Sequence, residues 1–576
     1  MLEALETREA VAVAARELAA AASGATRGDR AALERGEALL AQLRAAWRQV
    51  GQLFEPAVLL ELKRASASLD EGRARANRDA AARVLADVFG YQSFRPGQLE
   101  LIESVLAGRD SIGVMPTGAG KSLTYQIPAR ILGGVTLVIS PLIALMKDQV
   151  DAMNEVGVRA TSLNSTLSTE ERQARVEALA AGRYELVYAA PEGIEASVGR
   201  ALDALRLRLI AVDEAHCISE WGHDFRTAYR NLAGLKRRFG DVPVLALTAT
   251  ATERVVSDIV TQLGMRAPAT FRGSFFRGNL RLSAYKKGRD HGTPPVRDAV
   301  RRLVLARAGQ SGIVYCLARK TTEQLAEHLA AAGVRARAYH AKLSNEERAA
   351  TQEAFQRDDL DVVVATVAFG MGIDKSNVRY VIHHDMPRSV ESYYQEIGRA
   401  GRDGVASDCI LFYSWKEVRT YTEFGEELDA ASAERAFANA REMFELAESE
   451  GCRHVRLVGH FHEEIAPCGA SCDRCSGVDA LADAPRHRVA RARAEHALAA
   501  PLGADASLFE RLRELRRALA AERSVPAYVV FSDATLLEMA ARRPTSPSAL
   551  LAIPGVGPAK LERYGERFLE LLREPR

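Results

Sequence analysis

The stretch SIGVMPTGAGKS, residues 111–122, decides how this chain folds. It begins with an apolar run typical of a buried strand and continues into a glycine-rich turn. Gly118 and Gly120 allow backbone amides to approach phosphate oxygens, and Lys121 adds a cation beside them. Ser122 supplies a hydroxyl that can ligate Mg²⁺. The stretch therefore predicts a strand, a phosphate-binding loop and a helix, in that order.

A second apolar run, LRLIAV (207–212), ends in the acidic pair Asp213 and Glu214. At the tip of a strand, one carboxylate can join a metal shell while the other orients an attacking water. Each pattern alone is weak, because the strict phosphate loop requires glycine where Met115 stands and because acidic pairs also occur on surfaces by chance. Together on one sheet, the two patterns predict a nucleoside triphosphatase.

Apolar runs of strand length recur in two parts of the chain, separated by Pro294 and Pro295. Continuous apolar runs indicate parallel strands that helices bury on both faces. We therefore expect an α/β protein with two parallel-sheet domains in tandem. The expected strands are 111–115, 135–140, 185–190, 207–212 and 244–248 in the first domain, and 312–316, 335–340, 361–366, 380–384 and 409–413 in the second.

The composition of the 576-residue chain bears on its partners and on its cellular compartment. Its 77 Lys plus Arg nearly balance 75 Asp plus Glu, so a polyanionic partner would have to meet local basic patches. The first ten residues carry three Glu and no basic cluster, and the most apolar stretch, 133–146, is too short to span a bilayer. Seven cysteines are too few for a disulfide scaffold, so we expect a cytoplasmic protein.

Four of the cysteines cluster, with 15, 3 and 2 residues between them: Cys452, Cys468, Cys472 and Cys475. Four thiolates at this spacing can converge on one tetrahedral ion, and nothing nearby suggests an open ligand position, so structural Zn²⁺ is favoured over catalytic. Nearby histidines keep a mixed Cys/His site open: His454, His460 and His462. The other cysteines are interpreted as ordinary buried thiols: Cys217, Cys316 and Cys409.

The second domain ends in QEIGRAGRD (395–403), which begins with Gln395 and places Arg399 and Arg402 three residues apart. A domain without a phosphate loop needs a means of sensing ATP on its neighbour, and an arginine that reaches the γ-phosphate provides one. The alternative is an exposed helix with surface salt bridges. The tandem architecture favours the first interpretation.

These patterns resemble the motifs of the RecQ family of superfamily 2 DNA helicases, from about residue 85 to the C-terminus. The resemblance is carried by YQSFRPGQ (91–98), MPTGAGKS (115–122), SPLIALMKDQV (140–150), DEAHCISEWGHDFR (213–226), LTATAT (247–252), VVVATVAFGMGIDK (362–375) and YYQEIGRAGRDG (393–404). It implies tandem RecA-like domains. The four-cysteine segment is similar to the zinc-binding subdomain of the family. VPAYVVFSDATLLEMA (525–540) and LLAIPGVGPAKLERYG (550–565) resemble its small helical HRDC domain, for which Tyr528 and Lys560 are candidate contacts.

The resemblance implies which residues bind the nucleotide. Gln98 would read adenine, with Tyr91 and Arg95 beside it. The phosphates would be held by the loop residues Thr117, Gly118, Gly120 and Lys121.

It also implies roles in hydrolysis. Ser122 and Asp213 would hold Mg²⁺, and Glu214 would orient the water. Arg402 would be the arginine finger, with Arg399 supporting it.

An aromatic and charged loop follows the acidic pair directly, with the candidate residues Trp221, His223, Phe225 and Arg226. Aromatic residues can belong to a core. A mixture of this kind is instead typical of a platform on which bases stack beside a cation. The family resemblance implies the same, namely a loop that couples contact with single-stranded DNA to ATP hydrolysis.

Two parts of the chain depart from the family pattern. The fullest members carry a winged-helix domain between the zinc cysteines and HRDC, whereas only 31 residues separate Cys475 from Ser507 here. The first 80 residues are an Ala-rich addition, expected as short helices and interpreted as a brace or self-association element more than a DNA-binding one. The expected domains are the extension 1–80, helicase domains 81–275 and 276–415, zinc subdomain 416–478, linker 479–504 and HRDC-like domain 505–576.

The family resemblance implies an ATP-dependent DNA helicase that uses ATP, Mg²⁺ and Zn²⁺ and moves 3′ to 5′ along single-stranded DNA. Its substrates would be forked or duplex DNA, in repair and recombination. The alternative is a DNA-stimulated translocase or remodeller that unwinds weakly because it lacks the winged helix. A third hypothesis, a scaffold with an inactive nucleotide site, is disfavoured by the intact motif residues. Protein partners are expected through the HRDC-like domain or the N-terminal extension.

Overall fold

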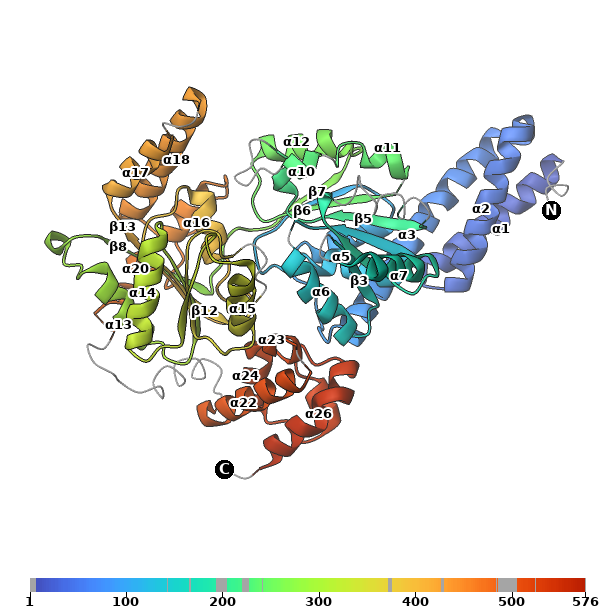
Figure 1. The fold of residues 1–576 in the computed structure, drawn as a ribbon. Helices are drawn as coiled ribbons and strands as arrows, with labels where there is room; N and C mark the ends of the chain where they lie inside the picture. The colour runs from blue at the N-terminus through green and yellow to red at the C-terminus, as the bar shows by residue number, and fades with distance from the viewer. Residues whose placement is uncertain are drawn as a thin grey trace.

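The computed structural model shows two parallel-sheet lobes side by side, a helical extension at the N-terminus and a helical domain at the C-terminus (Figure 1). It describes residues 7–141, 143–164, 167–192, 202, 205–219, 227–230, 232–240, 242–370, 375–425, 429–482, 484, 505–523 and 525–574. Among these residues, no helix combines the length and apolar character needed to cross a membrane.

The first lobe is built on a seven-stranded parallel sheet in the order β3-β4-β2-β5-β6-β1-β7. Its strands are β1 (Ser111–Val114), β2 (Val135–Ile139), β3 (Ala160–Leu163), β4 (Leu186–Ala189), β5 (Leu207–Val212), β6 (Val244–Thr248) and β7 (Ala269–Arg272). The five predicted strands of this domain are confirmed. Sequence patterns missed β3 and β7, the two edge strands, because neither has a continuous apolar run.

Helices cover both faces of this sheet, as the apolar runs predict. On β4, Val187 and Ala189 join one core cluster while Leu186 and Tyr188 join the other, because successive side chains point to opposite faces. The covering helices are α4 (Gln98–Leu106), α5 (Leu123–Leu132), α6 (Ile143–Glu155), α7 (Thr169–Ala180), α10 (Thr227–Arg230), α11 (Leu235–Phe239) and α12 (Glu253–Leu263), with the short η3 (Ala215–Ile218).

The second lobe has a six-stranded parallel sheet in the order β10-β11-β9-β12-β13-β8. Its strands are β8 (Leu280–Lys286), β9 (Ser311–Tyr315), β10 (Ala336–Tyr339), β11 (Val362–Ala365), β12 (Val378–His383) and β13 (Ser407–Tyr413), and its helices are η4 (Arg289–His291), α13 (Val296–Leu305), α14 (Arg319–Ala331), α15 (Asn345–Gln356) and α16 (Val390–Ile397). All five predicted strands are confirmed. The additional strand, β8, lies at one edge beside β13.

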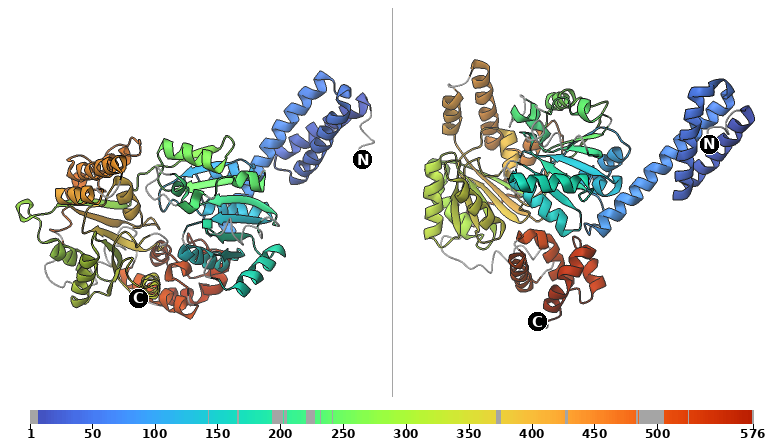
Figure 2. Two further views of the ribbon diagram at one scale, coloured as in Figure 1. Left: turned by 45° about the horizontal axis from the view of Figure 1, so that its top comes forward. Right: turned by 45° about the vertical axis from the view of Figure 1, so that its right-hand side comes forward.

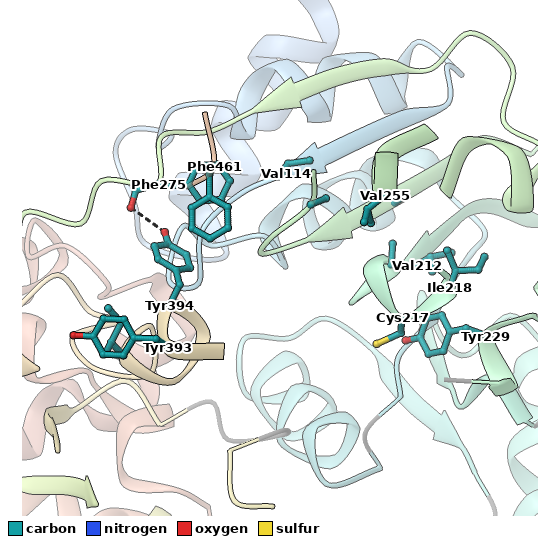
Figure 3. Packing of buried hydrophobic residues seen from close by; sticks show 14 of the residues in the cluster. Val114, Val212, Cys217, Ile218, Tyr229, Val255, Phe275, Tyr393, Tyr394 and Phe461 are labelled. Atoms are coloured by element: carbon teal, nitrogen blue, oxygen red, sulfur yellow. Dashed lines mark hydrogen bonds between the residues drawn. The ribbon is translucent and has the colours of Figure 1, made fainter. Parts of the chain in front are cut away.

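The segment that joins the lobes is anchored by aromatic packing. Phe275 stacks on Phe461 with ring centres 4.3 Å apart, and the hydroxyl of Tyr394 donates a hydrogen bond to the Phe275 carbonyl at 2.9 Å (Figure 3). Tyr394 belongs to α16, and Phe461 follows α19 of the zinc segment. This cluster therefore ties three parts of the chain together behind the cleft. The helices of the zinc segment are α17 (Trp415–Gly425), α18 (Ala430–Glu448), α19 (Arg453–Gly459) and α20 (Asp473–Ser476).

The N-terminal extension forms three long helices, where short ones were expected: α1 (Arg8–Thr26), α2 (Arg30–Val50) and α3 (Pro56–Asp87), with η2 (Gly51–Leu53) before α3. Gly24 lies inside α1, where its missing side chain lets Ala32 pack closely; a Cβ there would lie 2.7 Å from the Ala32 methyl. The boundary expected at residue 80 falls inside α3, whose Ala81 and Leu85 pack against the first lobe. Figure 2 shows the extension standing away from both lobes.

The C-terminal domain packs against both lobes, below the cleft between them in Figure 1. Its helices are α22 (Ala506–Glu522), α23 (Ala527–Val530), α24 (Asp533–Arg542), α25 (Pro547–Leu551) and α26 (Pro558–Arg573). On the first lobe, Glu155 pairs with Arg523 at 2.9 Å and also pairs with Arg563. The buried Arg516 of α22 lies 3.4 Å from Asp358 of the second lobe. These ion pairs join three units of the chain.

Candidate active site and metal centre

The cleft between the two lobes contains a cavity of about 450 Å³. All thirteen residues predicted to bind or hydrolyse the nucleotide line this cavity, although they come from four separate segments of the chain. They are Tyr91, Arg95, Gln98, Thr117, Gly118, Gly120, Lys121, Ser122, Asp213, Glu214, Gln395, Arg399 and Arg402.

The phosphate-type loop joins β1 to α5 and depends on two glycines. Gly118 has φ +84° and Gly120 has φ +77°, in the left-handed region that favours glycine. A Cβ on Gly120 would also lie 2.5 Å from the Gln98 side-chain nitrogen. Lys121 Nζ donates to the Met115 carbonyl at 3.1 Å, so the ammonium is held at the mouth of the loop. The conformation of the loop therefore places its backbone amides and the Lys121 ammonium close together.

Gln98, the first residue of α4, and Arg95, which precedes the helix, brace this loop. Gln98 is 1% exposed, and its amide nitrogen donates to the carbonyls of Ala119 and Gly120, each at 3.0 Å. Its side-chain oxygen accepts from the backbone of Arg95 at 2.9 Å, and the Arg95 guanidinium donates to the Gly118 carbonyl. A nucleotide base bound beside Gln98 and Arg95 would therefore meet the same side chains that hold the phosphate loop in place.

The acidic pair lies at the carboxyl end of β5, on the same edge of the sheet as the loop after β1. Glu214 adopts the left-handed conformation, with φ +49°, and its amide donates to Asp213 Oδ1 at 3.0 Å. His216 stands 3.4 Å from Glu214 Oε2 and 3.0 Å from the Thr248 hydroxyl. Glu214 is therefore turned into the cleft and linked through His216 to β6.

The second lobe contributes α16 and the loop that follows it. Gln395 Nε2 donates to the Thr250 hydroxyl of the first lobe at 3.5 Å, a bond across the cleft. Arg402 runs against the phosphate-type loop, since a Cβ on Gly118 would lie 3.4 Å from its Cα. The Arg399 guanidinium instead donates to the Gly370 carbonyl within its own lobe. Arg402 therefore lies beside the phosphate-type loop of the first lobe, whereas Arg399 contacts its own lobe.

Sequence patterns missed Arg277, which connects the two halves of the site. Its guanidinium donates to the Thr117 carbonyl at 2.5 Å and to the carbonyls of Ala400 at 3.1 Å and Gly401 at 2.8 Å. Burial lowers the pKa of Arg277 below its ordinary value. No local motif marks this residue, because the three carbonyls that it joins lie more than a hundred positions away in the chain.

The C-terminal domain also reaches this cavity, which sequence patterns did not predict. Tyr528, named above as a candidate contact of the HRDC-like domain, lines the cavity together with Ser532. Lys560, the other candidate, places its ammonium 5.6 Å from the ring centre of Phe531 within the domain. The four predicted DNA-coupling residues lie outside the described residues: Trp221, His223, Phe225 and Arg226.

The four clustered cysteines converge, as their spacing predicted. Their sulfur atoms all lie within 4.8 Å of one another, and those of Cys468 and Cys472 are 3.6 Å apart. Arg453 and Asp473, beside two of the cysteines, form a paired ion bridge with distances of 2.6 and 2.8 Å. Asp473 also accepts from the Ala284 amide at 3.1 Å, which fixes the centre to β8. This donor set and its support fit a structural zinc ion.

Two of the three nearby histidines, His454 and His460, have partners outside the thiol cluster. His454 Nε2 lies 3.1 Å from the carbonyls of Leu280 and Ser471, and His460 pairs with Glu391 at 2.9 Å. Among the described residues, the thiol cluster includes no histidine, so the alternative of a mixed Cys/His site is not supported.

A second candidate metal group, formed by Cys316, His384 and Asp385, does not fit an ion. Lys287 Nζ already lies 2.8 Å from Asp385 and supplies the positive charge at that position. Burial raises the pKa of the Cys316 thiol far above its ordinary value, so the thiolate that a metal requires is disfavoured.

Four family models match the chain in order: DEAD/DEAH box helicase at 95–259, helicase conserved C-terminal domain at 296–404, RecQ zinc-binding at 415–476 and HRDC domain at 505–572. ATP-dependent DNA helicase RecQ of Pasteurella multocida is 37% identical, over 86% of this chain and 94% of the relative. The chain belongs to the RecQ family. The RecQ relative from Bacillus subtilis is 36% identical, over 85% of this chain and 98% of its own length.

The RecQ assignment makes the protein an ATP-hydrolysing helicase and does not favour the weakly unwinding translocase. The Pasteurella alignment extends over 601 positions, whereas 86% of this 576-residue chain is about 495 residues. The RecQ relative therefore has about 100 positions without a counterpart here, as expected if a domain is missing.

Among solved structures, DUF1998 helicase MrfA bound to DNA is 19% identical, with a TM-score of 0.49 over 66% of this chain and 57% of that chain.

Proposed function

We propose that this RecQ helicase unwinds duplex DNA by moving 3′ to 5′ along one strand while it hydrolyses ATP in the cleft. The observation that carries this proposal is the gathering of all thirteen predicted residues from both lobes around one cavity. A site divided between two lobes links hydrolysis to their relative movement, which a translocating motor requires. Its proposed role is DNA repair and recombination.

In this proposal, the loop amides and Lys121 hold the phosphates. Ser122 and Asp213 would hold Mg²⁺, which would neutralise phosphate charge. Glu214 orients the attacking water with a carboxylate that lies beside His216, while its backbone amide donates to Asp213 Oδ1. Arg402 approaches from the second lobe and stabilises charge that develops on the transferred phosphoryl group. Arg399 and Gln395 position this loop.

Unwinding assays with tailed duplexes test the direction of movement. With ATP and Mg²⁺, a duplex that bears a single-stranded 3′ tail is expected to separate, whereas a 5′-tailed or blunt duplex of the same sequence stays paired. An RNA duplex with the same tail serves as the control for nucleic-acid type. Preferential separation of the 5′-tailed duplex would overturn the proposed polarity.

Replacing Arg402 with alanine is expected to lower DNA-stimulated turnover about 10³-fold, because an arginine finger acts on charge that develops only in the transition state. Nucleotide affinity should stay within about threefold of the parent. Single-turnover hydrolysis and binding of a fluorescent ATP analogue measure the two quantities. Arg337→Ala, an exposed position of the same lobe, is the matched control. An equal loss in affinity and turnover would contradict the finger role.

Replacing Trp221 with alanine should reduce the stimulation of ATP hydrolysis by single-stranded DNA about tenfold, because base stacking would be lost from the coupling loop. Hydrolysis without DNA should be unchanged. The measurement is steady-state turnover over a titration of single-stranded DNA. If basal and stimulated rates fall together, the loop has a structural role and the coupling proposal fails.

The proposed location is the cytoplasm. This proposal rests on the sequence, whose seven cysteines are too few for a disulfide scaffold. DNA in single-stranded, forked and duplex form is the proposed partner, and protein partners are proposed for the N-terminal extension or the HRDC domain. Because the HRDC domain is packed against both lobes, the extension is the more accessible of the two.

A further inference from the structure

The N-terminal extension contains a groove of about 590 Å³ between α2 and α3. Every residue that lines the groove belongs to one of these two helices, and α1 contributes none. The lining positions extend from Leu40 to Arg48 on α2 and from Leu59 to Asp70 on α3. At about 1.5 Å per residue, these stretches have the length of two to three helical turns. The groove thus has the dimensions of a seat for one further helix.

The floor of the groove is apolar. Leu43 and Leu62 lie along it, and Leu59 remains 36% exposed at one side. Trp47 is 44% exposed, although its ring packs edge-on against Phe54 with ring centres 5.2 Å apart. Large apolar side chains gathered in one exposed groove mark an interaction site more often than scattered ones do. Covering them would remove apolar surface from water.

The rim of the groove is positive. Arg44, Arg48 and Lys63 are exposed, and within the part of the chain that the structure describes none of them pairs with a carboxylate. The one acidic residue of the lining, Asp70, is already paired with Arg73 at 3.0 Å. Three cations therefore flank an apolar floor without compensating charge.

We propose that this groove binds an acidic amphipathic helix of a partner protein, with the apolar face of that helix on the floor and its carboxylates beside the three cations. In helix-in-groove binding, a partner helix places apolar anchors three and four residues apart in an apolar groove, and the leucines and Trp47 of the lining supply such a groove here. A second copy of this chain docked groove to groove would bring like cations together. Nucleic acid would place its phosphates over leucine and tryptophan side chains, which cannot solvate them.

Synthetic peptides of about 18 residues test the proposal with the full-length protein. Three labelled helical peptides carry the same stripe of leucines. They differ only in the residues beside that stripe, which are Glu in one peptide, Gln in the second and Lys in the third. Fluorescence anisotropy is expected to show that the Glu helix binds at least about tenfold more tightly than the Lys helix, with the Gln helix between them.

Two variants separate charge from packing. Arg48→Glu with Lys63→Glu should weaken the Glu helix about tenfold and strengthen the Lys helix, a reversal that general destabilisation cannot produce. Trp47→Ala should weaken all three peptides. Arg35→Glu with Arg64→Glu changes the same charge on the same helices outside the groove and should leave every affinity unchanged. DNA-stimulated ATP hydrolysis should be unaffected in all variants.

Three results would overturn the proposal. The first is no peptide binding at ~100 µM, or equal affinity for the three peptides. The second is a concentration-dependent mass in light scattering that the groove variants abolish, which would make a second copy the occupant. The third is loss of duplex DNA affinity in the Arg48 and Lys63 variant but not in its control, which would make nucleic acid the ligand.

Discussion

Replacing Glu214 with glutamine is expected to lower ATP turnover by about 10²–10⁴-fold, with or without DNA, while ATP still binds. The amide keeps the shape of the side chain but cannot polarise the attacking water as a carboxylate does. Glu214 lines the cavity with a left-handed backbone and lies 3.4 Å from His216, which agrees with the proposed role. Steady-state hydrolysis and equilibrium binding of a fluorescent ATP analogue measure the two effects.

Glu253→Gln, an exposed position on α12 of the same lobe, controls for the loss of one negative charge. Lys121→Ala provides a comparison of a different kind, because it removes a cation from the phosphate loop and should weaken binding as well as hydrolysis. Turnover of Glu214→Gln within a few-fold of the parent would show that another group orients the water.

The second large effect is expected at the zinc centre. Purified protein should contain about one zinc ion per chain, and Cys472→Ser should lose nearly all of it. Cys472 is 2% exposed and directly precedes α20, so the loss of the ion should also release that helix from β8. Zinc analysis, thermal unfolding and limited proteolysis of residues 415–478 should all change, because metal binding contributes directly to folding.

Cys409→Ala is the control for removal of a buried thiol, because Cys409 lies on β13 outside the cluster and should leave the zinc content unchanged. A Cys472→Ser and Cys475→Ser double variant that is soluble, free of zinc and fully active would refute a structural role for the ion. Retained zinc in that variant would show that other residues bind it.

The residues that line the site could largely be predicted from the sequence, because the motifs that mark them are local. A glycine that must adopt a positive φ, a lysine beside it and an acidic pair after an apolar run each occupy a few consecutive residues. The same holds for the four cysteines, whose short spacing restricts where their thiols can go. The roles of these residues remain predictions, which the variants above test.

The strands could also be predicted from local patterns in the sequence. Nine of the ten predicted strands are largely apolar runs, since parallel strands covered on both faces must be apolar. The exception is 335–340, the edge strand β10, in which arginines alternate with alanines. The three that were missed lie at sheet edges, where β7 alternates between half-buried and exposed positions. The length of α3 was also missed, because a helix that leaves one domain and enters another has no terminating signal between them.

The sequence by itself thus determined the two sheets, the phosphate-type loop, the acidic pair and the cysteine cluster. Only the tertiary structure decided that Arg277 joins Thr117 to Ala400 and Gly401, and that Glu155 and Asp358 dock the C-terminal domain across both lobes. Local patterns arise from the geometry of one turn or one strand. These contacts connect residues more than a hundred positions apart, and their energy exists only once packing has brought the partners together.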